Sequence, residues 1–170
     1  VPDIKSNPEV LNFLAGFANY GILSRLFFVL VGTLLTIVVQ SSSAAMALTL
    51  TLCSQGILPF DIAAAMILGE NIGTTITAEL ASLVGNVHAK RSARIHSMFN
   101  IIGVTWMIFM MPIYLSFIND ILISTGMVSP FTEASSIPIA LSYFHTAFNA
   151  SNVLLLIWFV PFLVKMAIKT

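Results

Sequence analysis

Residues 26–53 read LFFVLVGTLLTIVVQSSSAAMALTLTLC, and four polar side chains, Gln40 to Ser43, separate two apolar runs. A straight helix would place these side chains in the middle of a membrane, where polar groups without hydrogen bonds are costly. The apolar pieces contain 14 residues (26–39) and 10 residues (44–53), each fewer than the ~20 that cross a bilayer. The sequence therefore predicts a helix break at Gln40 to Ser43, as in the discontinuous helices of secondary transporters.

The composition of the whole chain indicates a membrane protein. Of its 170 residues, 58% are hydrophobic and 8% are charged, whereas soluble domains average ~45–50% and ~25%. Seven Lys and Arg balance seven Asp and Glu, so no basic surface can neutralise a nucleic-acid backbone, and nucleic acid is excluded as a partner. The single cysteine, Cys53, excludes a disulfide framework and a multi-cysteine metal site.

The polar residues do not form a recognisable catalytic set. Three consecutive serines suggest a nucleophile, but successive helix residues point ~100° apart. Neither His96 nor His145 has a carboxylate nearby in the sequence to orient it. We therefore expect the protein not to be an enzyme and to use no organic cofactor.

A second polar stretch follows another short apolar run. Residues 57–68 lead into Gly69-Glu70-Asn71-Ile72-Gly73-Thr74-Thr75. This glycine-rich and hydroxyl-rich stretch predicts a second break, and we expect the two breaks to meet in the protein interior. Glu70 and Asp61 are interpreted as charges at a hairpin tip or at the membrane interface. Glu79 is interpreted either as a cation ligand or as a carboxylate whose side chain reaches the membrane interface or a loop.

Two longer apolar stretches, residues 95–118 and about 137–164, predict full transmembrane helices. The expected fold class is all-α membrane protein, with two broken or re-entrant helical hairpin segments and two full transmembrane helices. We expect three regions, which are an interfacial helix and linker (1–23), the broken-helix region (24–94) and two transmembrane helices joined by an extracytoplasmic loop (95–170).

The N-terminal region carries a helix start signal, Asn7-Pro8-Glu9, in which a capping residue precedes proline at the first helical position. A helix from there to about Gly21 is too short to span, so we expect it at the membrane interface. The chain begins with Val1 and has no signal peptide pattern. We interpret it as a piece of a longer protein.

Basic residues predict the orientation in the membrane. Residues 86–94 and the C-terminus, with Lys165 and Lys169, are basic, whereas the loop between the two predicted spans carries Asp120 and Glu133 and no Lys or Arg. The positive-inside rule places the basic segments in the cytoplasm and the acidic loop outside. We expect a multi-pass protein of the plasma (inner) membrane, with the lipid bilayer as a partner.

The charge pattern favours a cation-coupled anion transporter. Between Arg25 and Lys90 there is no Lys or Arg, so an anion held there depends on backbone N–H groups, hydroxyls and helix N-termini. Unless the rest of the protein supplies Arg or Lys, co-bound cations must balance its charge. The oxygens that suit Na⁺ come from Gln40, Ser41, Ser42, Ser43, Asn71, Thr74 and Thr75. The alternative is that these small polar residues only pack helices together.

One short motif occurs twice, as His96 to Asn100 and as His145 to Asn149, with the pattern H-x-x-F-N. His and Asn four residues apart lie on one helix face. We favour a role in hydrogen bonding between transmembrane helices over direct ligand contact.

The two polar motifs, in this order and spacing, resemble the sodium/phosphate cotransporter family of the type II class. Members of that family have two inverted repeats, each with a QSSS segment and a G-x-N-I-G-T-T segment, and the substrate binds between the two QSSS breaks. Only one QSSS occurs here, so the chain resembles a single repeat. Glu70 stands where the family pattern has a small residue.

The resemblance implies half of a sodium-coupled inorganic phosphate symporter that works by alternating access. It implies phosphate binding at Gln40, Ser41, Ser42, Ser43, Asn71, Gly73, Thr74 and Thr75. The Na⁺ candidates are Gln40, Ser42, Asn71 and Thr74. The implied partners are phosphate, Na⁺ and the other repeat, in the same chain or a second subunit. An ion channel lined by the same residues, or a non-transporting assembly module, is the alternative function.

Overall fold

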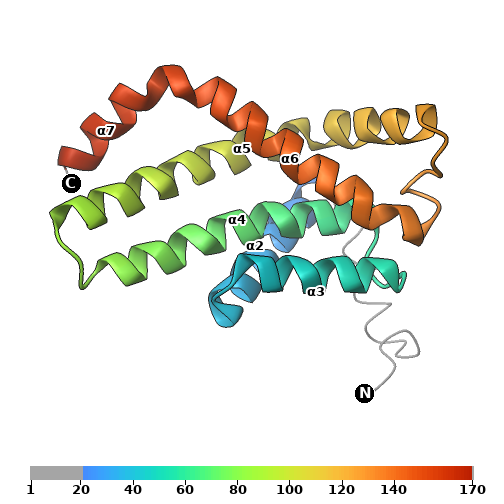
Figure 1. Ribbon diagram of the computed structural model, residues 1–170, viewed down its shortest axis with the longest axis horizontal. Coiled ribbons are helices and arrows are strands. Elements are labelled where there is room, and N and C mark those ends of the chain that lie inside the picture. The colour runs from blue at the N-terminus through green and yellow to red at the C-terminus, as the bar shows by residue number, and fades with distance from the viewer. Residues whose placement is uncertain (1–20, 170) are drawn as a thin grey trace.

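The computed structural model describes residues 21–169, in which every regular element is a helix (Figure 1). Residues 1–20 lie outside this part, and with them the interfacial helix that we expected after Asn7-Pro8-Glu9. Three segments are long and apolar enough to cross a membrane, which are Ile22–Val39, Val87–Ser124 and Ala134–Ile168. The all-α membrane class is confirmed. The first of these spans has 18 residues because its helix begins at Ile22 and not at Leu26.

The predicted break at Gln40 to Ser43 is confirmed. Helix α2 (Ile22–Val39) ends at Gln40, which has a left-handed backbone with φ of 55° and donates its N–H to the Thr36 carbonyl at 2.7 Å. Helix α3 (Ser42–Ser54) begins after Ser41, whose hydroxyl accepts the Ala44 N–H at 3.3 Å. Figure 1 shows this α2–α3 junction near the middle of the long axis of the molecule.

The predicted second break is wrong, because helix α4 (Phe60–Ser82) runs without interruption through residues 69–75. Its polar side chains donate to carbonyls of their own helix instead of opening it. The Asn71 amide donates to Ile67 O at 2.9 Å and the Thr74 hydroxyl to Glu70 O at 2.8 Å, while the Thr75 hydroxyl donates to Ile72 O at 2.7 Å. Such local bonds satisfy these groups within the helix.

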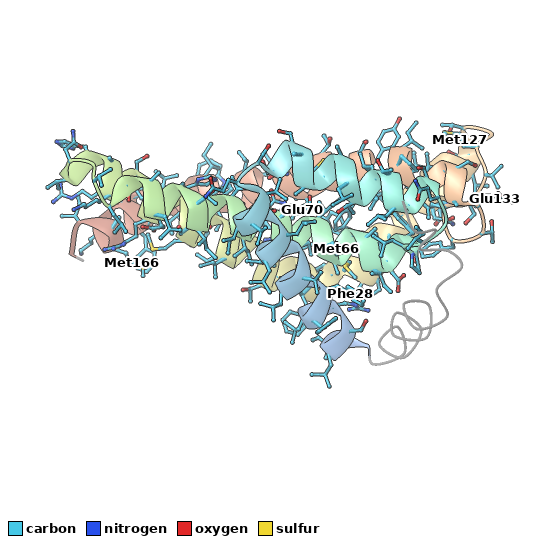
Figure 2. The ribbon with its side chains drawn as sticks, turned by 90° about the horizontal axis from the view of Figure 1, so that it is seen from below. Phe28, Met66, Glu70, Met127, Glu133 and Met166 are labelled. Carbon is cyan, nitrogen blue, oxygen red and sulfur yellow. The ribbon has the colours of Figure 1, made fainter. Side chains whose placement is uncertain are left out.

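The glycines of the same stretch pack α4 against α2. An added Cβ at Gly69 would collide with the Val29 carbonyl, and one at Gly73 would collide with Thr36; on α2, Gly32 lies equally close to the Met66 carbonyl. Small residues four positions apart allow membrane helices to approach in this way. In Figure 2, α2 crosses α4 obliquely near Phe28 and Met66.

The first predicted full span, 95–118, lies within a longer helix, whereas the second, about 137–164, is a helical segment divided by a 3-10 turn. Helix α5 (Val87–Ser124) has 38 residues and is about 57 Å long at 1.5 Å per residue, well beyond the ~30 Å hydrocarbon core. A 3-10 turn (Ala134–Ser136) then leads into helix α6 (Ile137–Leu156), and a second one, Ile157–Phe159, into helix α7 (Val160–Lys169). Helix α7 packs back against α5.

The basic stretch at 86–94, which we expected to form a loop in water, is helical from Val87 onward. Asn86 caps α5 by accepting the Ala89 N–H at 3.0 Å, and residues 87–94 form the first two turns. They can still lie in water because α5 exceeds the bilayer thickness. The α4–α5 turn and the end of α7 lie at one end of the molecule, and the α5–α6 connection lies at the other (Figure 1).

Candidate functional site

A cavity of about 340 Å³ opens where α3 begins and where α4, α5 and α6 pass it. Its polar lining comes from four helices and includes hydroxyls, amides, imidazoles and one carboxylate. The lining residues are Ser42, Ser43, Met46, Glu70, Asn71, Thr74, His96, Asn100, His145 and Asn149. The predicted meeting of the two polar motifs in the interior is thus found, although only the first is a break.

Four of the eight residues predicted from the sequence line this cavity, namely Ser42, Ser43, Asn71 and Thr74. The other four have different surroundings. Gln40 is exposed at the junction, and Ser41 caps α3. Gly73 and Thr75 are buried where α4 packs against its neighbours.

The start of α3 supplies hydrogen-bond donors to the cavity. The first N–H groups of a helix have no acceptor within that helix, and they carry the positive end of the helix dipole. Here Ser41 satisfies the Ala44 N–H, while Ser42 and Ser43 bring their hydroxyls to the cavity wall. Ser43 is exposed and Ser42 half-buried. An anion can therefore approach this helix end directly.

The α4 wall presents oxygen lone pairs. The only hydroxyl proton of Thr74 is donated to Glu70 O, and the Asn71 amide donates to Ile67 O. The Thr74 Oγ1 and Asn71 Oδ1 atoms keep their lone pairs, which are ligands for a hard cation. This wall is better suited to a cation than to an anion.

Glu70 is the residue that our sequence analysis misread. It is not at a hairpin tip or interface, since its side chain is only 1% exposed and lines the cavity. The Thr49 hydroxyl on α3 donates to Glu70 Oε1 at 2.7 Å, while Oε2 has no hydrogen-bond partner. The sequence contained a signal that Glu70 faces the site, because Glu70 and Thr74 are four residues apart and share a helix face.

The H-x-x-F-N residues also reach the cavity, so the predicted role between helices is wrong for their amides. Asn100 and Asn149 donate to carbonyls of their own helices, at 3.1 and 2.9 Å. Hydrogen bonds between α5 and α6 come from Asn152, which donates to Phe99 O at 3.1 Å and accepts from Trp106 Nε1 at 3.2 Å, and from Tyr114, whose hydroxyl bonds Ser151 Oγ at 2.8 Å. Sequence reasoning did not single out Asn152.

The cavity wall carries no fixed cation. None of its described lining residues is Lys or Arg. Arg25 lies in a separate pocket with Asp61 and donates Nη1–H to Ile108 O at 3.0 Å. Glu79 also lies outside the cavity, where it accepts a hydrogen bond from the Ser97 hydroxyl at 3.0 Å.

Comparisons with known proteins agree with the two motifs. The chain is 39% identical over 75 residues to the "Uncharacterized protein YqeW" of Bacillus subtilis, a match that covers 44% of this chain and 24% of YqeW. It is 39% identical over 89 residues to the mouse "Sodium-dependent phosphate transport protein 2C", covering 50% of this chain and 15% of that protein. It is 30% identical over 132 residues to the "Putative inorganic phosphate export protein YjbB" of Escherichia coli, covering 77% of this chain and 22% of that protein.

The chain thus matches less than a quarter of the length of each of these relatives. No solved structure matches it with comparable significance. Residues 11–130 match the family model described as Na+/Pi-cotransporter, which is more than half of the chain. The chain therefore belongs to the Na+/Pi-cotransporter family.

Proposed function

We propose that this chain forms half of a sodium-coupled phosphate symporter, with phosphate bound in the cavity at the start of α3. The observation that carries the proposal is the position of Ser42 and Ser43, which bring a helix N-terminus and two serine side chains to a cavity of about 340 Å³. Phosphate accepts hydrogen bonds from backbone N–H groups and hydroxyls at such helix ends. The names of the mouse and Escherichia coli relatives support phosphate as the substrate.

Sodium coupling follows from the charge of the cavity. A helix N-terminus supplies only about half a positive charge, and the described lining adds a carboxylate but no Lys or Arg. A multiply charged oxyanion needs more positive charge than this. The lone pairs of Asn71 and Thr74 suit Na⁺ beside the anion. We retain Ser42 as a shared ligand and place Gln40, which is exposed, at the rim.

A partner half would complete the site. Ser43 and His96 are exposed, so the cavity is not closed by the described residues. The other inverted repeat, in the same protein or in a second subunit, would cover this opening and bring its own helix break to the anion. Movement of the two halves about the bound phosphate would then expose it to each side of the membrane in turn.

Alanine at Ser42 or Ser43 should weaken phosphate binding by the complete transporter ~10–150-fold, the usual effect of losing a hydrogen bond to a charged ligand. The measurement is equilibrium binding of radiolabelled phosphate in sodium buffer. Ser54→Ala is the matched control, because Ser54 lies at the other end of α3 and bonds only Thr51 O in the described contacts. Equal losses at Ser43 and Ser54 would show that phosphate binds elsewhere.

We further propose that the end of the molecule with the α4–α5 turn faces the cytoplasm of the plasma (inner) membrane, by the positive-inside rule. A cysteine at Ser135, exposed before α6, should react with an impermeant maleimide from outside in whole cells, and a cysteine at Ser92 only after lysis. Both positions are exposed, and the natural Cys53 is buried and adds little background. Labelling of Ser92→Cys in intact cells would show that the orientation in the membrane is the opposite of the proposed one.

A further inference from the structure

We propose that Glu70 is a sodium ligand, and that the ion binds at its Oε2 atom in the wall of the cavity. The inference deepens the proposed function and rests on it for the identity of the cation. It adds a residue that lies outside the QSSS segment and that neither polar motif assigns to ion binding.

The carboxylate is built into the site. Glu70 is 1% exposed, and the Thr49 hydroxyl fixes its orientation by donating to Oε1 at 2.7 Å. In Figure 2, Glu70 lies beside the junction of α2 and α3. Two buried side-chain oxygens in the described part of the chain have no hydrogen-bond partner, and Glu70 Oε2 is one of them. A buried carboxylate oxygen of this kind, in a residue that lines a cavity, is positioned to bind a ligand.

That ligand must carry positive charge. A buried carboxylate without a partner is strongly unfavourable, so buried charges are paired or bind metal ions. The other titratable groups that line the cavity are His96 and His145, and no ion pair joins either one to Glu70 in the described contacts. With no Lys or Arg in that lining, the carboxylate is neutralised either by a proton or by a cation from solution, and the oxygen ligands around it favour the cation.

The surrounding atoms are oxygens of the kind that alkali cations prefer. Thr49 Oγ1 keeps lone pairs while its proton is donated to Oε1, and Thr74 Oγ1 keeps lone pairs while its proton is donated to Glu70 O. This set contains oxygen ligands and one negative charge, which is the chemistry of a hard monovalent cation.

Sodium should therefore stabilise the purified full chain in phosphate-free buffer, with choline replacing sodium at constant ionic strength. The melting temperature of the wild-type protein should rise with sodium concentration, because a ligand that binds only the native state stabilises it. Glu70→Gln removes the charge and keeps an acceptor for Thr49. It should weaken the apparent sodium affinity ~10–150-fold, as expected for loss of a charged ligand.

Glu79→Gln is the matched control, because Glu79 lies on the same helix, bonds Ser97 and does not line the cavity. It should keep the sodium dependence of the wild-type protein. An unchanged sodium dependence in Glu70→Gln, or the absence of any sodium effect in the wild-type protein, would overturn the proposal. If Glu70→Gln does not fold, Glu70→Asp gives the answer, since the shorter carboxylate should lower sodium affinity, and unchanged affinity would overturn the site.

This experiment is separate from the test of the proposed function because it contains no phosphate. The phosphate site would be rejected and the cation site retained if Glu70→Gln loses sodium binding while alanine at Ser42 or Ser43 leaves phosphate affinity unchanged. The phosphate site would be retained and the cation site rejected if alanine at either serine weakens phosphate binding while Glu70→Gln leaves sodium affinity unchanged.

Discussion

Replacing Gly69 with leucine should separate α2 from α4 and destabilise the protein by more than ~4 kcal/mol, a loss typical of severe core disruption. A Cβ at this position already collides with the Val29 carbonyl and lies 2.8 Å from the Thr33 backbone nitrogen. These are backbone atoms, so they cannot move away without moving the whole of α2. The Thr33 hydroxyl, which donates to both Val29 O at 2.8 Å and Gly69 O at 3.0 Å, would lose the contact that joins the two helices and keep the one within α2.

Thermal unfolding in detergent, followed by circular dichroism, measures this effect. Ala81→Leu is the control, because it adds the same kind of side chain to α4 at an exposed position and should change stability little. Gly103→Ala should have an intermediate effect, since its Cβ would meet the Asn152 side chain, which can shift, and not a backbone. Wild-type stability in Gly69→Leu would mean that the two helices are not packed together in this way.

The contrast between the two polar motifs shows what the sequence can and cannot predict. Gln40 to Ser43 follow one another without interruption, and a helix there would expose all four on different faces, so a break was predictable. Gly69 to Thr75 have a similar composition but remain helical. Their hydroxyls and amides bond carbonyls three or four residues back, and composition does not reveal whether such local bonds form.

The candidate site was predictable only where it coincides with these motifs. Ser42 and Ser43 could be identified from the break itself, since a helix N-terminus beside a polar cluster is a known anion site. Glu70, Asn100 and Asn149 reach the same cavity through the packing of three different helices. The relative rotation of packed helices depends on their contacts, such as the Asn152 bridge between α5 and α6. A single sequence contains no direct signal for that rotation.

Sodium should increase phosphate affinity of the complete transporter by about 100-fold, and phosphate should increase sodium affinity by the same factor, because equilibrium coupling is reciprocal. The reason is that Glu70 and the serines at the start of α3 line one cavity. Two like unit charges about 5 Å apart repel by ~3 kcal/mol at an effective dielectric constant of ~20, which is a factor of ~100–200 in affinity. Sodium at Glu70 would cancel this repulsion before the anion binds.

Glu70→Gln tests the cause of the coupling. Without the carboxylate, phosphate no longer meets the repulsion, so the variant should bind phosphate more tightly than the wild-type protein in choline buffer. Its affinity should then change little when sodium is added, whereas Ser54→Ala should keep the full sodium effect. Calorimetric titration of each ligand at fixed concentrations of the other measures both factors. Equal phosphate affinity of the wild-type protein in sodium and choline would contradict the coupling mechanism. The two titrations must give the same factor at equilibrium whatever the cause of the coupling, so their agreement checks the measurement.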